Sequence, residues 1–360
     1  MEDLITTRGV FVLNNELYRI SGDGVYVLVD RMVREYVVFG PVMRNGDISF
    51  EQIQESSILL LDYKGRALLP VKKFFLPPRE VLFEYEIIDG DIVIRDRLSA
   101  SPQRKKLLFG VRACDIAGLE IMRKTFDRNF RDPYVLSRME SMVVIGVMCS
   151  EVLPTCFCYQ ADSGPLPKGG FDMFLVPLGD HYLVEVGSKE GRKIVLDNKD
   201  LFSQASPGDV ALRDSTVEKL IEKMRNINIP HLSTLYNRFI ESYESSLWDV
   251  YAERCLSCGK CNFVCPTCYC FDIHDETDLG LKRGARIREW DSCHFLSFTR
   301  VASGEIFRRD RSSRVKQRIY HKFVYSINDI GSISCVGCGR CVEVCPASID
   351  PREIIREIIG

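Results

Sequence analysis

Histidine and tryptophan are scarce in this sequence, and long apolar runs are missing. There are five histidines and two tryptophans among 360 residues, and no apolar stretch approaches the roughly 20 residues that a membrane-spanning helix needs. The 48 basic and 50 acidic residues leave a formal net charge of -2, so the strongly basic field that nucleic-acid binding requires is also missing. We therefore expect a globular protein with no membrane and no nucleic acid among its partners.

The sequence also lacks an export signal and a recognisable catalytic constellation. Its first residues, MEDLITTRG, contain acidic side chains early and no apolar core, which predicts a cytoplasmic protein. No GxGxxG loop follows a predicted strand, and no serine, histidine and acid lie in a convincing catalytic context. We identify no independent catalytic site, so the sequence leaves open whether the chain is an enzyme by itself.

Cysteine, by contrast, is abundant. The chain has fifteen cysteines, none of them before Cys114, and most of them lie between Cys255 and Cys345. A cytoplasmic protein keeps its thiols reduced, so this number does not indicate a disulfide framework. The cysteines instead predict metal ligands.

Two copies of one four-cysteine motif are the strongest signal in the chain. CLSCGKCNFVCP at 255–266 and CVGCGRCVEVCP at 335–346 share the spacing Cys-x2-Cys-x2-Cys-x3-Cys-Pro. This spacing is typical of two-cluster ferredoxins, in which three cysteines of a run bind one 4Fe-4S cluster and the fourth binds the other. Zinc is the alternative, but its four-cysteine sites usually use two separated pairs. The predicted ligands are Cys255, Cys258, Cys261 and Cys345 for the first cluster, and Cys335, Cys338, Cys341 and Cys265 for the second.

Four further cysteines, Cys114, Cys149, Cys156 and Cys158, lie in the middle of the chain. Four thiolates suffice for another cubane, so this set predicts a third 4Fe-4S cluster. Inert buried thiols and a zinc site are the alternatives, because free cysteines often behave as small apolar residues.

The last three cysteines are Cys268, Cys270 and Cys293, close in sequence to the first motif. We expect thiols that shield or hydrogen-bond the neighbouring cluster and so tune its reduction potential. The alternative is a further metal site, with His294 or His274 as its fourth ligand. The sequence does not decide between these roles.

The hydrophobic pattern predicts an α+β protein in three parts. Residues 1–100 form a β-rich module, with predicted strands at 24–30, 36–40 and 58–63 and a hairpin turn at Asp89-Gly90. Residues 101–208 form a small α/β unit in which Cys114 and Cys149 follow strand ends. Residues 209–360 form a helical, ferredoxin-like domain with two clusters, which resembles that of succinate dehydrogenase iron-sulfur subunits. Its stretch at 306–318 is locally basic, which indicates either a solvated face or a surface that docks an acidic partner.

Several motifs together resemble one protein family. They are KKFFLPPREVLFEY (72–85), FGVRACDIAGL (109–119), GVMCSEVLPTCFC (146–158), CNFVCPTCYCFD (261–272), REWDSC (288–293) and CVGCGRCVEVCP. The chain resembles the beta subunits of cytosolic NiFe hydrogenases of the sulfhydrogenase or NADP-reducing type, and it is similar also to the electron-input subunits of anaerobic sulfite reductases. GVRAC and GVMC are more weakly similar to motifs of coenzyme F420 hydrogenase beta subunits.

The resemblance implies an iron–sulfur subunit of an oxidoreductase complex. Such a subunit relays electrons between a flavin subunit that handles NAD(P)H and the small and large subunits of a NiFe hydrogenase. Other functions stay open: an electron-input subunit of a sulfite reductase, a flavin or F420 reductase subunit with its own active site, or clusters that are purely structural. The direction of electron flow is not determined by the sequence.

Overall fold

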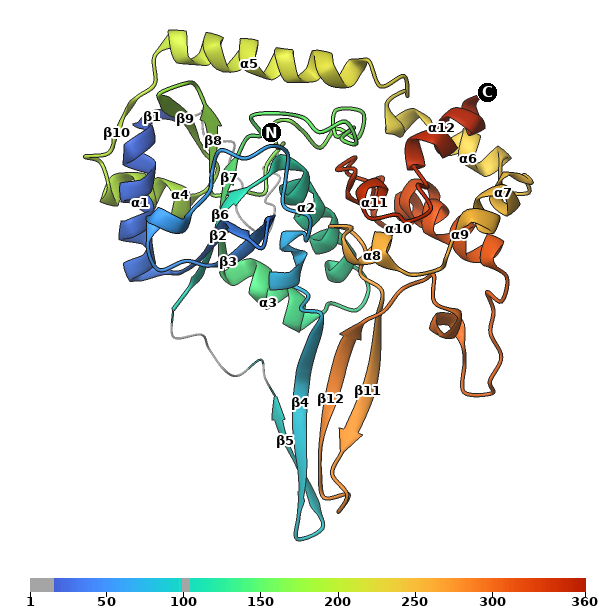
Figure 1. The fold of residues 1–360 in the computed structure, drawn as a ribbon. Coiled ribbons are helices and arrows are strands. Elements are labelled where there is room, and N and C mark those ends of the chain that lie inside the picture. Colours follow the sequence, from blue (N-terminus) through green and yellow to red (C-terminus); the bar gives the residue numbers. More distant parts are fainter. Residues whose placement is uncertain (1–15, 97, 99–103) are drawn as a thin grey trace, which may run out of the picture.

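The computed structural model describes residues 16–96, 98 and 104–360 of the chain. They form an α/β body, a helical region at the C-terminal side and a narrow β arm that projects away from both (Figure 1). Within the described residues, no helix is long and apolar enough to cross a bilayer. The two tetracysteine motifs belong to the helical region, and Cys114 and Cys149 belong to the body.

An eight-stranded mixed sheet forms the centre of the body. Its inner strands β2, β6, β7 and β8 run parallel, and antiparallel neighbours flank them on both sides. Every residue of β7 is buried, as expected for a parallel strand covered on both faces. In spatial order the strands are β10 (Phe202–Gln204), β1 (Leu17–Ser21), β9 (His181–Val186), β8 (Met173–Pro177), β7 (Met142–Val147), β6 (Lys106–Val111), β2 (Val37–Arg44) and β3 (Asp47–Gln52).

Helices cover both faces of this sheet (Figure 1). Alternate residues of a strand point to opposite faces, so Leu107 and Phe109 of β6 pack in the core with α1 and α4. Leu108 packs in the opposite core with α2 and α3. The four helices are α1 (Gly22–Glu35), α2 (Ala113–Asp127), α3 (Pro133–Ser141) and α4 (Lys189–Asp197).

The parallel strands β6 and β7 end at the same edge of the sheet. Cys114 lies in the first turn of α2, directly after β6, and Cys149 lies two residues after the end of β7. Because the carboxyl ends of parallel strands are adjacent, this connectivity brings the two cysteines to one place. The predicted strand, helix and strand at this point are therefore confirmed.

The arm is a four-stranded antiparallel sheet of two hairpins, in the order β11 (Phe271–Thr277), β12 (Arg283–Trp290), β4 (Arg79–Ile88) and β5 (Asp91–Asp96). The predicted hairpin turn joins β4 to β5, with φ of 52° at Asp89 and 93° at Gly90. The arm combines strands from residues 1–100 with strands from 209–360, and β1, β2 and β3 join the large sheet. The boundary expected at residue 100 therefore does not separate two sheets, since strand pairing here is non-local.

Two strands predicted near the N-terminus are wrong. Residues 24–30 belong to α1, because Ser21 caps the helix by accepting a hydrogen bond from the Gly24 amide. The helix then buries Val25, Leu28, Val29 and Met32, which lie on one face at helical spacing. Residues 58–63 form an irregular segment rather than a strand. Apolar and β-branched composition alone therefore does not identify a strand, because a buried helix face or a buried irregular segment has the same composition.

The region after residue 206 is mainly helical, as predicted. A π-helical segment, His321–Tyr325, continues α9 into α10, and Phe239 stacks on Phe323 with ring centroids 4.7 Å apart in the aromatic core. The helices are α5 (Pro207–Arg225), α6 (Tyr236–Glu241), α7 (Leu247–Arg254), α8 (Lys260–Phe263), α9 (Arg311–Tyr320), α10 (Ser326–Ile330), α11 (Arg340–Glu343) and α12 (Pro351–Ile359).

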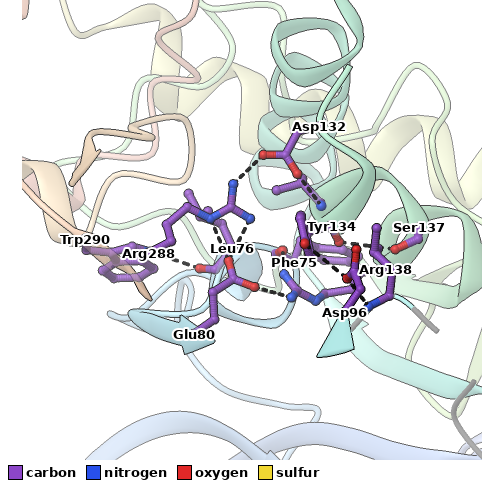
Figure 2. Close-up of polar contacts among 12 residues, drawn as sticks. Phe75, Leu76, Glu80, Asp96, Asp132, Tyr134, Ser137, Arg138, Arg288 and Trp290 are labelled. Carbon is purple, nitrogen blue, oxygen red and sulfur yellow. Dashed lines mark hydrogen bonds and ion pairs between the residues drawn. The ribbon is translucent and has the colours of Figure 1, made fainter. Parts of the chain in front are cut away.

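A buried ionic network joins the base of the arm to α3 (Figure 2). Arg288 on β12 donates from Nε to Glu80 of β4 at 2.8 Å and also pairs with Asp132, the N-cap of α3. Arg138 of α3 pairs with the same Glu80. The indole of Trp290 donates to the Leu76 carbonyl at 3.0 Å.

We expect Arg288→Met to lower the free energy of unfolding by about 3–5 kcal/mol, because it leaves two carboxylates without their buried partner. The control is Arg283→Met, which removes an ion pair with Glu86 that is 2.6 Å long but largely exposed on the Arg283 side, and should cost about 0–1 kcal/mol. Denaturant titration of the anoxic protein measures both. Equal effects of the two substitutions would contradict this role for Arg288.

Candidate metal centres

The two tetracysteine motifs adopt the same local structure. Each forms a loop that ends in a one-turn helix, α8 in the first motif and α11 in the second. The residue before each helix is a glycine in the left-handed region, Gly259 with φ of 71° and Gly339 with φ of 70°. A Cβ on Gly339 would also collide with the Thr155 carbonyl. Glycine is therefore required there both by backbone conformation and by close packing.

The first motif and the end of the second enclose one cavity. Its lining includes the complete set predicted for the first cluster, Cys255, Cys258, Cys261 and Cys345. Cys258 is exposed, and it is the one exposed cysteine among the fifteen. The first cavity therefore has a thiol at the protein surface.

A second cavity lies beside the second motif. Its lining includes the complete set predicted for the second cluster, Cys265, Cys335, Cys338 and Cys341. The exchange of the fourth cysteine between the two motifs, which the spacing predicts, thus matches the way in which the chain encloses these two cavities.

The four middle cysteines line a third cavity. Cys114 and Cys149 reach it from the strand ends, and Cys156 and Cys158 reach it from the loop that follows. Cys338 of the second motif lines it as well. Residues more than a hundred positions apart in sequence are thus brought together around one space.

The three cavities are adjacent to one another. Arg318 lines both the first and the second, and Cys338 lines both the second and the third. The loop that carries Cys156 and Cys158 is hydrogen-bonded to the second motif, because the Phe157 amide donates to the Gly337 carbonyl at 2.7 Å. The thiol sets therefore form a continuous series from Cys258 at the surface into the α/β body.

Buried ion pairs hold the second motif against that body. Arg340 of α11 pairs with Asp115 of α2 at 2.7 Å, with both side chains almost fully buried. Arg66 pairs with Glu343 at 2.9 Å and donates to the Cys338 carbonyl at 2.5 Å. These contacts order the wall between the second and third cavities.

Five other buried cations have no carboxylate partner among the residues that the structure describes: Lys72, Arg112, Arg314, Arg318 and Lys322. Arg318 donates to the Asn262 side chain at 3.1 Å and to the Cys261 carbonyl at 3.4 Å. Lys322 donates to the carbonyl and hydroxyl oxygens of Thr267. Lys72 donates to the carbonyls of Asn262 and Cys268, at 3.1 and 2.8 Å.

These cations test whether an iron–sulfur cluster fits the site. A buried charge without a counter-charge costs several kcal/mol, and a cluster bound by four thiolates is a net anion. Burial alone lowers the pKa of Lys322, but the thiolates of Cys265 and Cys268 outweigh burial and raise that pKa above its ordinary value. Burial lowers the pKa of Lys72 to about 8, against the opposing effect of Cys268. The surroundings are therefore suited to an anionic cluster.

The three remaining cysteines lie beside the cluster cavities and line none of them. Cys268 is hydrogen-bonded to Cys265, which lowers the pKa of the Cys265 thiol. The amide of Asn262 donates to the Cys293 sulfur at 3.1 Å, and Cys293 is in turn hydrogen-bonded to Cys270. This placement agrees with the hydrogen-bonding role that we expected for these thiols.

The two histidines considered as further ligands lie apart. His294 lines the first cavity, with Nδ1 4.0 Å from the Cys255 sulfur, whereas His274 is on β11 in the arm, beside Asp272 and Glu276. Within the described residues, no three histidine, cysteine or acidic side chains are grouped closely enough to hold a single metal ion.

The structure also reveals site residues that sequence reasoning missed. They are Lys72, Asn262 and the neighbouring pair Arg318 and Lys322, from three separate places in the chain. Lys72 and Arg318 both donate to Asn262, and Arg318 and Lys322 line the second cavity. Basic residues outside a motif are normally exposed, so no sequence signal marks these as buried. Of the basic stretch 306–318, Arg314 and Arg318 are buried while Arg309 and Arg311 are exposed, so it is not simply a solvated face.

Comparison with known proteins agrees with this geometry. A family model described as a 4Fe-4S dicluster domain matches residues 254–349, which contain both tetracysteine motifs. The F420-dependent formate dehydrogenase subunit beta of Methanocaldococcus jannaschii is 26% identical over 170 residues, 46% of this chain and 35% of that protein.

A second relative covers nearly the whole chain. Sulfhydrogenase 2 subunit beta of Pyrococcus furiosus is 35% identical over 328 residues, which make up 89% of this chain and 92% of that protein. The similarity includes the body as well as the dicluster domain. The chain therefore belongs to the sulfhydrogenase beta-subunit family and is an iron–sulfur electron-transfer subunit of an oxidoreductase.

Proposed function

We propose that this chain carries electrons through three 4Fe-4S clusters, between a flavin subunit that handles NAD(P)H and the small and large subunits of a NiFe hydrogenase. The observation that carries the proposal is the series of three adjacent cavities, each lined by one complete predicted set of four cysteines; Cys341 of the second set also lines the first cavity, and Cys338 also lines the third. The relative named as a sulfhydrogenase subunit supports a hydrogenase as the complex.

The ligands follow from the cavity linings. Each cluster stores and releases single electrons, and the chain sets the distance, burial and charge around it. The first cluster would be held by Cys255, Cys258, Cys261 and Cys345, the second by Cys265, Cys335, Cys338 and Cys341, and the third by Cys114, Cys149, Cys156 and Cys158.

The third cluster rests on its own observations. Burial raises the pKa of Cys156 to about 11, and burial also raises that of Cys158, so neither thiol would ionise unaided near neutral pH. Metal binding would ionise both thiols, because the charge of the metal deprotonates a coordinating thiol. Cys158 also lies 3.5 Å from the Met224 sulfur, which closes one side of this cavity.

The surface end of the relay is the first cavity, since Cys258 is exposed there. Leu256 beside it is 64% exposed and Phe307 is 68% exposed. The Arg314 side chain links the two segments, donating to the Ser257 hydroxyl at 3.4 Å and to the carbonyls at 308 and 309. Lys260 and Arg309 are exposed cations on the same segments. The exposed apolar side chains would be buried in an interface, and the two cations would attract an acidic partner that has its own redox group.

Cluster number is tested by iron and acid-labile sulfide analysis of anoxically purified protein. We expect about twelve irons per chain, and about eight in the double variant Cys156→Ser/Cys158→Ser, because three cubanes become two. Cys293→Ser is the control and should retain about twelve. A wild-type value of about eight would contradict the third cluster.

The docking surface is tested by charge reversal in the complete complex. Lys260→Glu/Arg309→Glu should slow electron transfer to the partner about tenfold at low ionic strength, because steering by opposite charge is lost. Added salt should shrink the difference, since it screens exposed charges. The control reverses two exposed lysines on and after α4, Lys193→Glu/Lys199→Glu, and stopped-flow kinetics measures all three proteins. Equal rates in both double variants would exclude this surface.

A further inference from the structure

Arg318 occupies a position that no other cation in the site shares. It is on α9 and lines both the first and the second cavity, whereas Lys322, one helical turn later, lines only the second. The residue is only 8% exposed, and its guanidinium reaches Cys261 of the first ligand set through the backbone carbonyl. The positive charge is thus placed between the two proposed clusters.

The side chain is held rigidly in that position. The Nε group donates to Oδ1 of Asn262, which is itself buried in α8 of the first motif. The amide nitrogen of Asn262 is occupied by Cys293, so the Asn262 side chain cannot turn away without losing that contact. The Lys72 ammonium donates to the backbone carbonyl of Asn262. These contacts fix the guanidinium between the two cavities rather than toward solvent.

A fixed buried charge acts strongly on both neighbours. Within the protein the effective dielectric constant is far below that of water, so a cation favours the reduced, more negative form of each adjacent cluster. A charge between two clusters acts on both of them, and it also offsets the repulsion that one reduced cluster exerts on the other. Lys322 is also a cation, but it lines only the second cavity.

We propose that Arg318 is the shared counter-charge of the first two clusters, raising the reduction potentials of both, and that Lys322 raises that of the second cluster alone. This inference rests on the proposed function, because it requires clusters in both cavities. Arg318 is a positioning residue rather than a ligand: it acts through its charge and makes no bond to iron.

The test is an EPR-monitored redox titration of the full chain, loaded and purified without oxygen. Cys258→Ser and Cys335→Ser, one ligand from each set, assign the two signals. Arg318→Gln should lower both midpoint potentials, Lys322→Gln should lower only that of the second cluster, and Arg318→Lys should stay close to the wild type because it keeps the charge. Iron content accompanies each titration.

A shift of one signal only in Arg318→Gln, or of neither, with iron content unchanged, would overturn the inference while leaving the proposed function intact. A merely structural role predicts that Arg318→Lys and Arg318→Gln lose clusters together with no ordered change in potential. Should Arg318→Gln fail to load, Asn262→Asp sets a carboxylate against the same guanidinium and should lower both potentials; unchanged potentials there would also overturn the inference. Wild-type protein without clusters would instead refute the proposed function.

Discussion

Charge balance in a buried interior is the constraint on which the C-terminal half of this structure depends. Lys72, Arg318 and Lys322 are withdrawn from water without a carboxylate partner among the described residues, and thiols surround them. Neither group is stable in this arrangement without the other, because an isolated buried cation and a cluster of buried thiolates each carry a large desolvation cost. An anionic metal cluster offsets both costs, and the helices that pack the aromatic core of this region also enclose the cysteine-lined cavities.

The α/β body has a different part in the same arrangement. Its parallel strands deliver Cys114 and Cys149 to one edge of the sheet, and the following loop packs backbone to backbone on the second tetracysteine motif. The Arg340–Asp115 pair then ties the two regions together with a fully desolvated contact. The body therefore packs directly against the second tetracysteine motif and carries the four cysteines that line the third cavity. The family similarity over nearly the whole chain is consistent with this shared construction.

The arm is not an independent module of the chain. Its four strands come from two distant stretches, and its base is joined to α3 by a buried network of charged residues (Figure 2). Trp290, at the end of β12, lies under the Lys72 ammonium at 4.3 Å from the ring centroid. The arm is thereby connected to the residues beside the first two cavities, so its position and the geometry of the cluster site depend on each other.

Much of this protein could be predicted from sequence wherever the determining contacts are local. The Asp89-Gly90 pair predicted its hairpin, and continuous apolar runs predicted β6 and β7. Cysteine spacing predicts an exchange of ligands between the two motifs. The strand expected at 24–30 was wrong because apolar composition does not distinguish a buried strand from a buried helix face; the segment instead forms a capped helix that buries Val25, Leu28 and Val29 in the core.

What the sequence determined by itself is the chemistry: the number of thiols, their grouping by spacing and the kind of cluster that suits them. What only the tertiary structure decided is their surroundings. The meeting of the third thiol set with Cys338, the common sheet built across residue 100 and the burial of Arg318 between two cavities all arise from contacts between residues far apart in the chain. Such contacts leave no local pattern, because burial and charge pairing depend on what packs against a residue and not on its sequence neighbours.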